Sequence, residues 1–267
     1  MKSQNLALCA LACAFVSARA QSAPVVTPPH ADSTMHRLAV DGTRLQPAQF
    51  LYQLSLMRDS SSSPLGDQRF VVSALDYAGT PALLLARNGI EGIALASDSL
   101  VVRRDDLRPL HWITVRGPAR VAAEFTPDSV FGAMTSPLGR QNVVLPNRAD
   151  ILANTMAIDA VLSLLPLSAA WRDSASLILI DAGGSTLTPA TLAVEGEEHV
   201  TVPAGEFDCW IVSVEAERAS ERLWVTKQGQ IVVRAEQVLP DLGATLVRTL
   251  SQSDSPALMP TSARLPH

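Results

Sequence analysis

The residues with the clearest potential for chemistry are Asp181-Ala182-Gly183-Gly184-Ser185, which follow the apolar run Leu177–Ile180. An aspartate on a glycine-rich turn after a strand can work in hydrolysis when a second carboxylate shares its proton. No second copy of this motif occurs in the chain. The sequence therefore favours a simple hairpin joining strands at Ser176–Ile180 and Thr186–Val194. An aspartic-type hydrolase at Asp181 stands as an alternative.

The histidines do not form a recognisable catalytic or metal-binding pattern. His30, His36 and His267 fall in segments expected to be tails, and His111 and His199 are isolated from one another. A zinc site requires three or four nitrogen or sulfur ligands, usually in closely spaced pairs. A serine triad is recognised by geometry and not by chain order, but the G-x-S-x-G elbow is missing. We expect His111 to be a half-buried residue of a strand.

Two acidic clusters are candidates for cation binding. One joins Asp98 to Asp105-Asp106, and the other consists of Glu195 with Glu197-Glu198. A calcium loop needs alternating oxygen ligands, as in D-x-[DN]-x-[DN]-G, and neither cluster has that spacing. Both clusters are expected to be solvated charges at turns. The sequence thus assigns no catalytic, cofactor-binding or metal-ligating residue.

Aromatic residues and the cysteine offer one further possibility. Trp112, Trp210 and Trp224 lie in predicted strands, where they either line a ligand cleft or pack in the core. Cys209 has apolar neighbours and no histidine nearby, so we expect a small buried hydrophobe and not a nucleophile. Aromatic residues make up only 4% of the chain, so its core must rest mainly on aliphatic side chains.

The elements that must position these residues are mostly strands. Apolar and β-branched runs recur at short intervals between turn signals such as Ala78-Gly79 and Gly117-Pro118, a spacing typical of an antiparallel meander. The predicted strands are 49–57, 69–77, 80–87, 99–103, 109–116, 119–125, 129–135, 141–145, 176–180, 186–194, 207–214, 221–226, 230–238 and 243–250. Segment 59–64 is expected to be a flexible loop, and 89–98 mostly a loop with a short strand.

One helix is predicted between Asn147, as its N-terminal cap, and Leu165, with Pro166 ending it. Its apolar residues surround most of the helix, so it must lie against the sheet. A carrier of apolar ligands would have a cavity of several hundred Å³ between this helix and the sheet. Tight packing around Ile158, Leu162 and Leu165 without a cavity would argue against a carrier.

The stretch Val200–Glu236 has the strongest pattern. Pro203 and Gly205 predict a turn, and Gly229 suits the positive φ of a hairpin loop. From the period of two, we expect one buried face shared by residues of three strands, namely Phe207, Ile211, Leu223, Val225, Ile231 and Val233. Trp210, Val212 and Val214 are expected on the opposite face, which should also be at least partly covered.

The ends of the chain indicate export. Lys2, the apolar run Leu6–Val16 and the A-x-A site at Ala18-Arg19-Ala20 predict a signal peptide over residues 1–20, cleaved near Ala20-Gln21. Its apolar run is too short for a stable transmembrane anchor. We expect a disordered spacer at 21–36, a single β-rich domain at 37–250 and a disordered tail at 251–267. The predicted location is periplasmic or secreted.

Charge restricts the partners. The net charge of −5 becomes more negative by two when Lys2 and Arg19 leave with the signal peptide. The sequence has no basic block, so nucleic acid is not an expected partner. An acidic chain is also a poor match for an anionic membrane surface.

Five short segments of the chain form a pattern in their order and spacing: Val202-Pro203-Ala204-Gly205-Glu206-Phe207-Asp208-Cys209, Leu223-Trp224-Val225, Ile231-Val232-Val233-Arg234, Asp105-Asp106-Leu107-Arg108-Pro109-Leu110 and Leu164-Leu165-Pro166-Leu167. Together they resemble a family of exported bacterial proteins known as a domain of unknown function of the DUF-3108 type. Val232 stands where that family usually has proline. The resemblance implies a half-barrel similar in shape to lipoprotein-carrier domains, but fold analogy transfers no function.

These observations predict one fold and leave several alternative functions open. The expected fold is mainly β: a single curved antiparallel sheet, a half-barrel or open barrel with meander connections, with one apolar helix packed on it. The expected function is a non-enzymatic envelope protein that binds a lipid, another apolar ligand or a partner protein, without a cofactor. A structural or assembly accessory of the cell envelope is the main alternative, and a hydrolase is the other.

Overall fold

The computed structural model describes residues 38–91, 94–181, 184–217 and 219–255, and these residues form one sheet of 15 strands around one α-helix. The predicted signal peptide, the spacer at 21–36 and residues 256–267 of the predicted tail lie outside the described residues. Of two short 3₁₀ helices, Gly42–Arg44 precedes the first strand and Pro240–Leu242 precedes the last one.

The first half of the sheet is an antiparallel meander in which each strand pairs with the next one along the chain. Its strands are β1 (Ala48–Arg58), β2 (Ser61–Tyr77), β3 (Thr80–Glu91), β4 (Ala94–Arg103), β5 (Pro109–Arg116), β6 (Ala119–Phe125), β7 (Ser129–Ser136) and β8 (Gly139–Pro146).

The second half contains the helix and a second meander. Its elements are β9 (Ile151–Leu152), α1 (Thr155–Leu162), β10 (Arg172–Asp181), β11 (Gly184–Val202), β12 (Gly205–Ala216), β13 (Ala219–Thr226), β14 (Val232–Leu239) and β15 (Ala244–Ser253). Only β9 breaks the antiparallel pattern, since Ile151 and Leu152 pair in parallel with Ser176 and Leu177.

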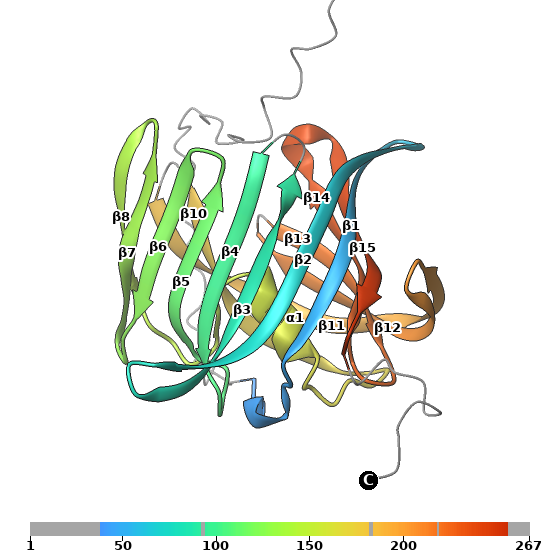
Figure 1. The fold of residues 1–267 in the computed structure, drawn as a ribbon, viewed down its shortest axis with the longest axis horizontal. Coiled ribbons are helices and arrows are strands. Elements are labelled where there is room, and N and C mark those ends of the chain that lie inside the picture. Colours follow the sequence, from blue (N-terminus) through green and yellow to red (C-terminus); the bar gives the residue numbers. More distant parts are fainter. Residues whose placement is uncertain (1–37, 92–93, 182–183, 218, 256–267) are drawn as a thin grey trace, which may run out of the picture.

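The two meanders join where β1 pairs with β15, so the first and last described strands are neighbours in the middle of the sheet (Figure 1). The sheet therefore runs from β8 at one end to β9 at the other. It curves until β8 comes close to β11, but these strands do not pair and the sheet is not closed. This confirms the predicted single curved antiparallel sheet.

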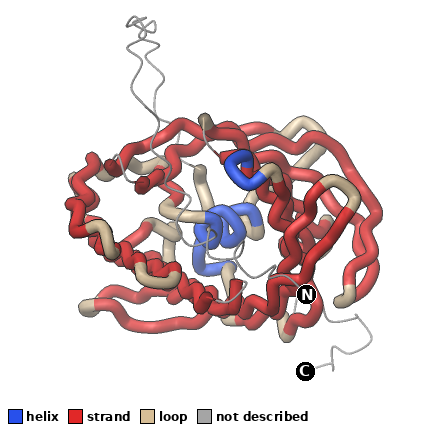
Figure 2. The backbone as a smooth tube through the Cα atoms, turned by 90° about the horizontal axis from the view of Figure 1, so that it is seen from above, coloured by secondary structure: helices blue, strands red, loops and turns tan. Residues whose placement is uncertain are grey.

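Helix α1 lies inside the curve, surrounded by strands (Figure 2). All its residues from Met156 to Leu162 are buried. A helix covered on every side must be apolar on every side, which explains why its sequence lacks a polar face. The exception is Asp159, which is charged and only 5% exposed.

Several strands are longer than the sequence pattern predicts. The expected loop at 59–64 is only a turn, because β2 begins at Ser61 and pairs with Arg58. Of the segment 89–98, expected to be mostly loop, residues 89–91 belong to β3 and residues 94–98 to β4, and these strands pair as far as Glu91 with Ala94. The last strand extends to Ser253, into the predicted tail. Pairing with a neighbouring strand satisfies the backbone hydrogen bonds of these segments, and local propensity alone does not reveal that pairing.

The helix is shorter than predicted and starts later. Its N-terminal cap is Asn154, whose side chain accepts a hydrogen bond of 3.1 Å from the Ala157 amide, and not Asn147. Asp150, expected in the first helical turn, instead accepts a hydrogen bond of 2.6 Å from the Ser176 hydroxyl. Ile151 and Leu152 pair with the edge of β10 and form a short strand, although their apolar spacing is that of a helix.

The predicted common face of β12 and β13 is wrong. Ala216 pairs with Ala219 across the turn, so each odd-numbered residue of β12 lies opposite an even-numbered one of β13. Val212 consequently shares a face with Leu223, and Ile211 with Trp224. Val212 and Leu223 are fully buried, whereas Phe207 and Ile211 are only partly buried. The length of the turn set the register in which β12 pairs with β13, and this register determines which side chains share a face of the sheet.

Candidate functional site

A cavity of about 520 Å³ lies inside the curved sheet at the N-terminal end of α1. Strands β1 to β5 form one wall, strands β13 to β15 form another, and Ala153, Asn154 and Thr155 contribute the start of the helix. Ile178 of β10 also lines it. Because these elements come from distant parts of the chain, the cavity exists only once the two meanders have joined.

A buried ionic cluster borders this cavity. Asp159 of α1 accepts hydrogen bonds of 2.6 and 2.9 Å from Arg248 on β15, and one of 2.7 Å from Arg87 on β3. Arg87 also donates a hydrogen bond of 2.7 Å to the hydroxyl of Thr155. All three charged residues are no more than 6% exposed. Two guanidinium groups thus share one carboxylate, which leaves one excess positive charge beside the cavity.

The electrostatics of the cluster keep both arginines charged. Burial lowers the pKa of Arg87, and the positive charge of Arg248 lowers it further. Burial also acts against Arg248, but the charge and hydrogen bonds of Asp159 outweigh it and raise the pKa of Arg248 overall. The ordinary pKa of arginine lies so far above 7 that both guanidinium groups remain positively charged at neutral pH. Tyr52 completes the cluster, since its ring lies 4.8 Å from the Arg248 guanidinium.

Glu221 of β13 lines the same cavity, and its pKa is raised towards neutral pH. Its carboxylate makes no hydrogen bond or ion pair with any part of the chain that the structure describes. Burial raises the pKa of Glu221 from 4.5 to about 7, and the charge of Asp159 adds to the rise, while Arg248 and Arg87 oppose it. Glu221 therefore changes charge near neutral pH.

Unpartnered polar atoms concentrate at this cavity. Within the described residues, five buried side-chain nitrogen or oxygen atoms lack a hydrogen-bond partner. Four belong to residues that line the cavity: Gln68 Oε1, Arg87 Nε, Trp112 Nε1 and Asn154 Nδ2. A buried polar atom without a partner costs roughly 1–3 kcal/mol, so such atoms are rare in folded proteins. Their clustering marks the lining of this cavity as the place where unmet hydrogen-bonding capacity gathers in the described residues.

The rest of the lining is mostly apolar, with Thr114, Gln237 and one ion pair between the apolar side chains. The apolar residues are Leu54, Leu65, Ile178, Ala235, Leu239, Leu242 and Leu246. Asp98 and Arg116 form an ion pair of 2.6 Å, in which the Asp98 side chain is 8% exposed and that of Arg116 is 40% exposed. The cavity thus combines apolar side chains from both walls with unpartnered polar atoms, most of which are hydrogen-bond donors.

A match to a known protein family classifies this chain. The model of the family described as "Protein of unknown function (DUF3108)" matches residues 71–250, which is more than half of the chain. The chain belongs to this family. Arg87, Asp159, Glu221 and Arg248 all fall within the matched residues. No curated protein matches the sequence.

Solved structures similar to this DUF3108 protein are distant. A protein from Bacteroides fragilis assigned as exported, with a YmcC-like fold, is 12% identical, with a TM-score of 0.41 over 81% of this chain and 100% of that one. A beta-barrel-like DUF1849 protein from Brucella abortus is 12% identical, with a TM-score of 0.46 over 81% of this chain and 99% of that one.

The residues that carry the DUF3108 resemblance mostly lie away from the cavity. Val202 pairs with Gly205 around the predicted turn, at the junction of β11 and β12, and neither residue lines the cavity. Gly229 has the predicted positive φ, of 81°. Arg234 stacks 4.7 Å from the ring of Trp224 and also does not line it. These signature residues therefore build the fold and do not form the candidate site.

The motif at Asp181 forms the expected hairpin. Asp181 ends β10 and pairs with Gly184 at the start of β11. Ala182, Gly183 and the side chain of Asp181 lie outside the described residues. The backbone therefore agrees with the simple hairpin, and the hydrolase alternative gains no support.

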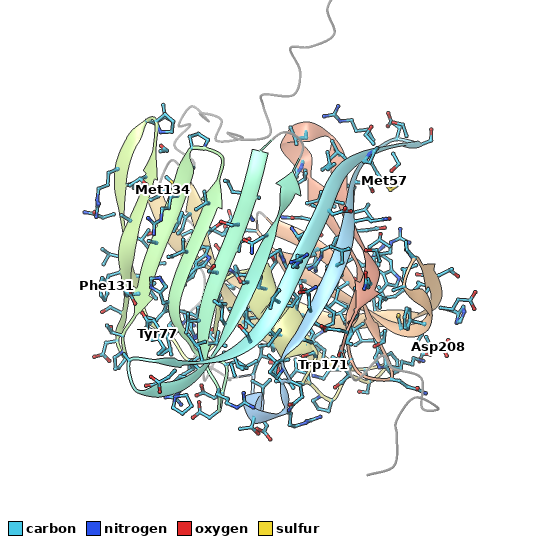
Figure 3. The ribbon with its side chains drawn as sticks, viewed as in Figure 1. Met57, Tyr77, Phe131, Met134, Trp171 and Asp208 are labelled. Atoms are coloured by element: carbon cyan, nitrogen blue, oxygen red, sulfur yellow. The ribbon has the colours of Figure 1, made fainter. Side chains whose placement is uncertain are left out.

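Neither His111, His199 nor the acidic clusters line the cavity, except for Asp98. His111 is partly buried, its Nδ1 lies 2.6 Å from Glu124, and its ring stacks on Tyr77. His199 pairs with Asp208 on the far side of the molecule from Tyr77, as Figure 3 shows. In the described residues no group of three or more histidine, cysteine or acidic side chains is placed to hold a metal.

The acidic clusters are neutralised by neighbouring cations or donors. Arg103 pairs with both Asp105 and Asp106, and Asp98 joins Arg116 instead of that cluster. Glu195 pairs with Arg222 and Glu197 with Lys227. Glu198 accepts a hydrogen bond of 2.6 Å from Trp224 Nε1.

Of the three tryptophans proposed for a ligand cleft, only Trp112 lines the cavity. Trp224 is 4% exposed and packs beneath Arg234, and Trp210 lies beneath Lys227 at 4.4 Å. Cys209 is fully buried, as expected, and burial raises the pKa of its thiol to about 12.

The sequence patterns did not identify Arg87, Asp159, Glu221 and Arg248 as candidate site residues. A usable signal was present, because Asp159 stands in the apolar run Met156–Leu162 and Arg87 ends the apolar run Ala82–Ala86. A charged residue inside an apolar element is rarely buried without a partner. Which partner it finds depends on the strand order, and that was not evident from the sequence.

Proposed function

We propose that this DUF3108 protein is a non-catalytic binding protein of the bacterial cell envelope that holds a small amphipathic ligand inside its curved sheet. The observation that carries the proposal is the cavity of about 520 Å³, lined by leucines on one part and by unpartnered polar atoms on another. Its volume falls in the range of roughly 300–1,000 Å³ that is common for small-molecule sites.

The chemistry of the lining supports binding over catalysis. Among the described residues that line the cavity there is no serine, cysteine, histidine or lysine, and the carboxylate of Asp98 is held in an ion pair with Arg116. Cys209, with its raised pKa, is not a nucleophile either. The export predicted from residues 1–20 supports an envelope location. No helix in the described part of the chain has the length and apolarity that crossing a bilayer requires.

The position of the cavity differs from the expected one. Ile158, Leu162 and Leu165 are buried and line neither this cavity nor the smaller one of about 140 Å³ near Ser163. The space lies beyond the N-terminal end of the helix and not along its apolar side. The proposal therefore keeps the carrier-like binding role but places the ligand next to the ionic cluster.

A fluorescent probe and a matched pair of variants test the proposal. The uncharged dye N-phenyl-1-naphthylamine should give a saturable, one-to-one rise in fluorescence with the mature protein. Leu239 lines the cavity, whereas Val238, its neighbour on β14, does not and is 49% exposed. Leu239→Trp should abolish the saturable signal, and Val238→Trp should keep it.

A second pair of variants, on β15, controls for loss of binding through misfolding. Leu246 lines the cavity, and Thr245, the next residue towards the N-terminus, does not. Leu246→Trp should also abolish binding, and Thr245→Trp should preserve it, in variants whose near-ultraviolet circular dichroism matches the wild type. Saturable binding that survives both cavity-filling changes in folded protein would contradict the proposal. A complete lack of dye binding would favour the structural or assembly role.

A further inference from the structure

The cavity contains an unbalanced set of charges, and this imbalance points to the chemistry of its ligand. Arg87 and Arg248 bind one carboxylate, Asp159, in a buried cluster. Asp98 and Arg116 balance one another at the rim. The remaining charged residue of the lining is Glu221, whose carboxylate has no hydrogen-bonding partner among the described residues. The cavity lining and the cluster beside it thus hold one excess positive charge and one carboxylate without a hydrogen-bonding partner.

A carboxylate from a ligand could take this space. Arg87 Nε, Trp112 Nε1 and Asn154 Nδ2 are donors without acceptors, and all three residues line the cavity. A carboxylate is an acceptor with two oxygens, and it gains most from charge-assisted hydrogen bonds to arginine. The leucines of the other wall, such as Leu239 and Leu246, would contact an aliphatic chain.

Two carboxylates cannot share this position while both are charged. Like charges in a partly buried site repel one another strongly, and the usual relief is that one of them takes up a proton. Every charged group near Glu221 is accounted for: Arg87 on β3, Asp159 on α1 and Arg248 on β15 act on it directly, and Asp98 on β4 and Arg116 on β5 line the same cavity.

We propose that the ligand is a single-chain amphiphile with a monoanionic carboxylate head, and that Glu221 must be protonated for that head to bind beside Arg87 and Arg248. This inference rests on the proposed binding function and goes further by naming the head group and a proton as co-ligand. A dianionic head such as phosphate exceeds the single positive charge available, whereas a carboxylate matches it.

The position of the Glu221 titration makes the coupling measurable. Because its pKa lies near 7, Glu221 is mostly protonated at pH 6 and mostly charged at pH 8. An aliphatic carboxylate titrates near pH 4–5 and is ionised at both values. If only the protonated form of Glu221 accepts the head group, affinity falls about tenfold between pH 6 and pH 8.

Isothermal titration calorimetry with octanoate and 1-octanol tests the inference. Octanoate should bind about tenfold more tightly at pH 6 than at pH 8, and titrations in buffers of different ionisation enthalpy should show uptake of nearly one proton at pH 8. Octanol lacks the charged head, so it should bind more weakly than octanoate at pH 6 and show little change with pH.

Glu221→Gln supplies the decisive variant because glutamine mimics the protonated acid. It should bind octanoate at pH 8 as tightly as the wild type does at pH 6, without proton uptake. Glu215 is the matched control, since it is exposed and occupies the adjacent rung on the other face of the same strand pair. Glu215→Gln should keep the wild-type pH dependence.

The outcomes separate this inference from the proposed function. Octanol binding equal to octanoate binding, or an octanoate affinity that does not change with pH, would overturn the carboxylate and proton coupling while leaving a binding cavity. Tighter binding of octyl phosphate than of octanoate would overturn the choice of head group. If none of these compounds and no neutral dye binds, the binding function itself is wrong.

Discussion

Arg248 and Asp159 meet inside the sheet through two hydrogen bonds, of 2.6 and 2.9 Å, although 89 positions separate them in the chain. Their pairing ties the last strand to the enclosed helix. Arg87 joins from β3 through the same carboxylate. The helix is therefore held in the curve by charge as well as by apolar contact.

Asp159→Asn tests how far the fold depends on this cluster. The change keeps the shape of the side chain but leaves two buried guanidinium groups without a counter-charge. Breaking a buried ion pair in this way costs about 3–5 kcal/mol, so we expect the free energy of unfolding in urea to fall by that amount. Asp67→Asn, at an exposed position on β2, should change it by less than about 0.5 kcal/mol. Equal stabilities for the two variants would show that the cluster contributes little.

Because the pKa of Glu221 is raised, we expect the stability of the ligand-free protein to depend on pH. Its pKa is raised from 4.5 to about 7, so between these values the folded protein binds more protons at this group than the unfolded chain does. The contribution of Glu221 to stability is therefore complete below pH 4.5 and is lost as the pH rises through 7. Glu221→Gln should remove this loss and raise the free energy of unfolding at pH 8 by on the order of 2 kcal/mol relative to wild type. Urea unfolding of both proteins at pH 5 and pH 8 measures the difference, and a variant that gains nothing at pH 8 would contradict the assignment.

Gly132 predicts a steric limit within the sheet. A Cβ at this position of β7 would lie 2.0 Å from the carbonyl oxygen of Ala122 and 2.7 Å from the Cα of Ala123. Both atoms belong to the backbone of β6 and cannot move independently, so Gly132→Ala should destabilise the protein by at least about 1–3 kcal/mol. Gly196 is the control, because a Cβ there meets nothing within 4 Å. Gly196→Ala should be neutral or slightly stabilising in thermal unfolding. The reverse order would mean that the contact of β6 with β7 is not as close as described.

Cys209 predicts an unreactive thiol. It is fully buried, and burial, followed by the charges of Asp208 and Glu198, raises its pKa to about 12. The thiolate is the reactive form, so the native mature protein should not react with Ellman's reagent at pH 8, whereas urea-unfolded protein should react fully. Ser174→Cys adds a thiol at an exposed position of β10 and should react at once in the native state. Rapid native labelling of Cys209 would reopen the question of a nucleophilic cysteine.

The strands and their turns were largely evident in the sequence. Pro109–Arg116 and Ala119–Phe125 are observed with the predicted bounds, because Gly117-Pro118 marks the turn between two alternating runs. The meander order followed in the same way, since short turns leave little choice but to pair neighbouring strands. Stretches such as 61–64 and 94–98 carried no such signal, because their strand geometry depends on partners supplied by the rest of the sheet.

The sequence by itself determined that the chain forms an antiparallel sheet with one enclosed helix, because alternation, turn residues and an all-round apolar helix are local properties. The tertiary structure alone decided which strands meet and which residues face inward. The pairing of β1 with β15 brings Arg87 and Arg248 to one carboxylate, and a turn between Ala216 and Ala219 turns Glu221 into the cavity. Strand order and register are properties of the whole sheet, since a shift by one residue exchanges the inner and outer faces. The candidate site could therefore be found only in the folded protein.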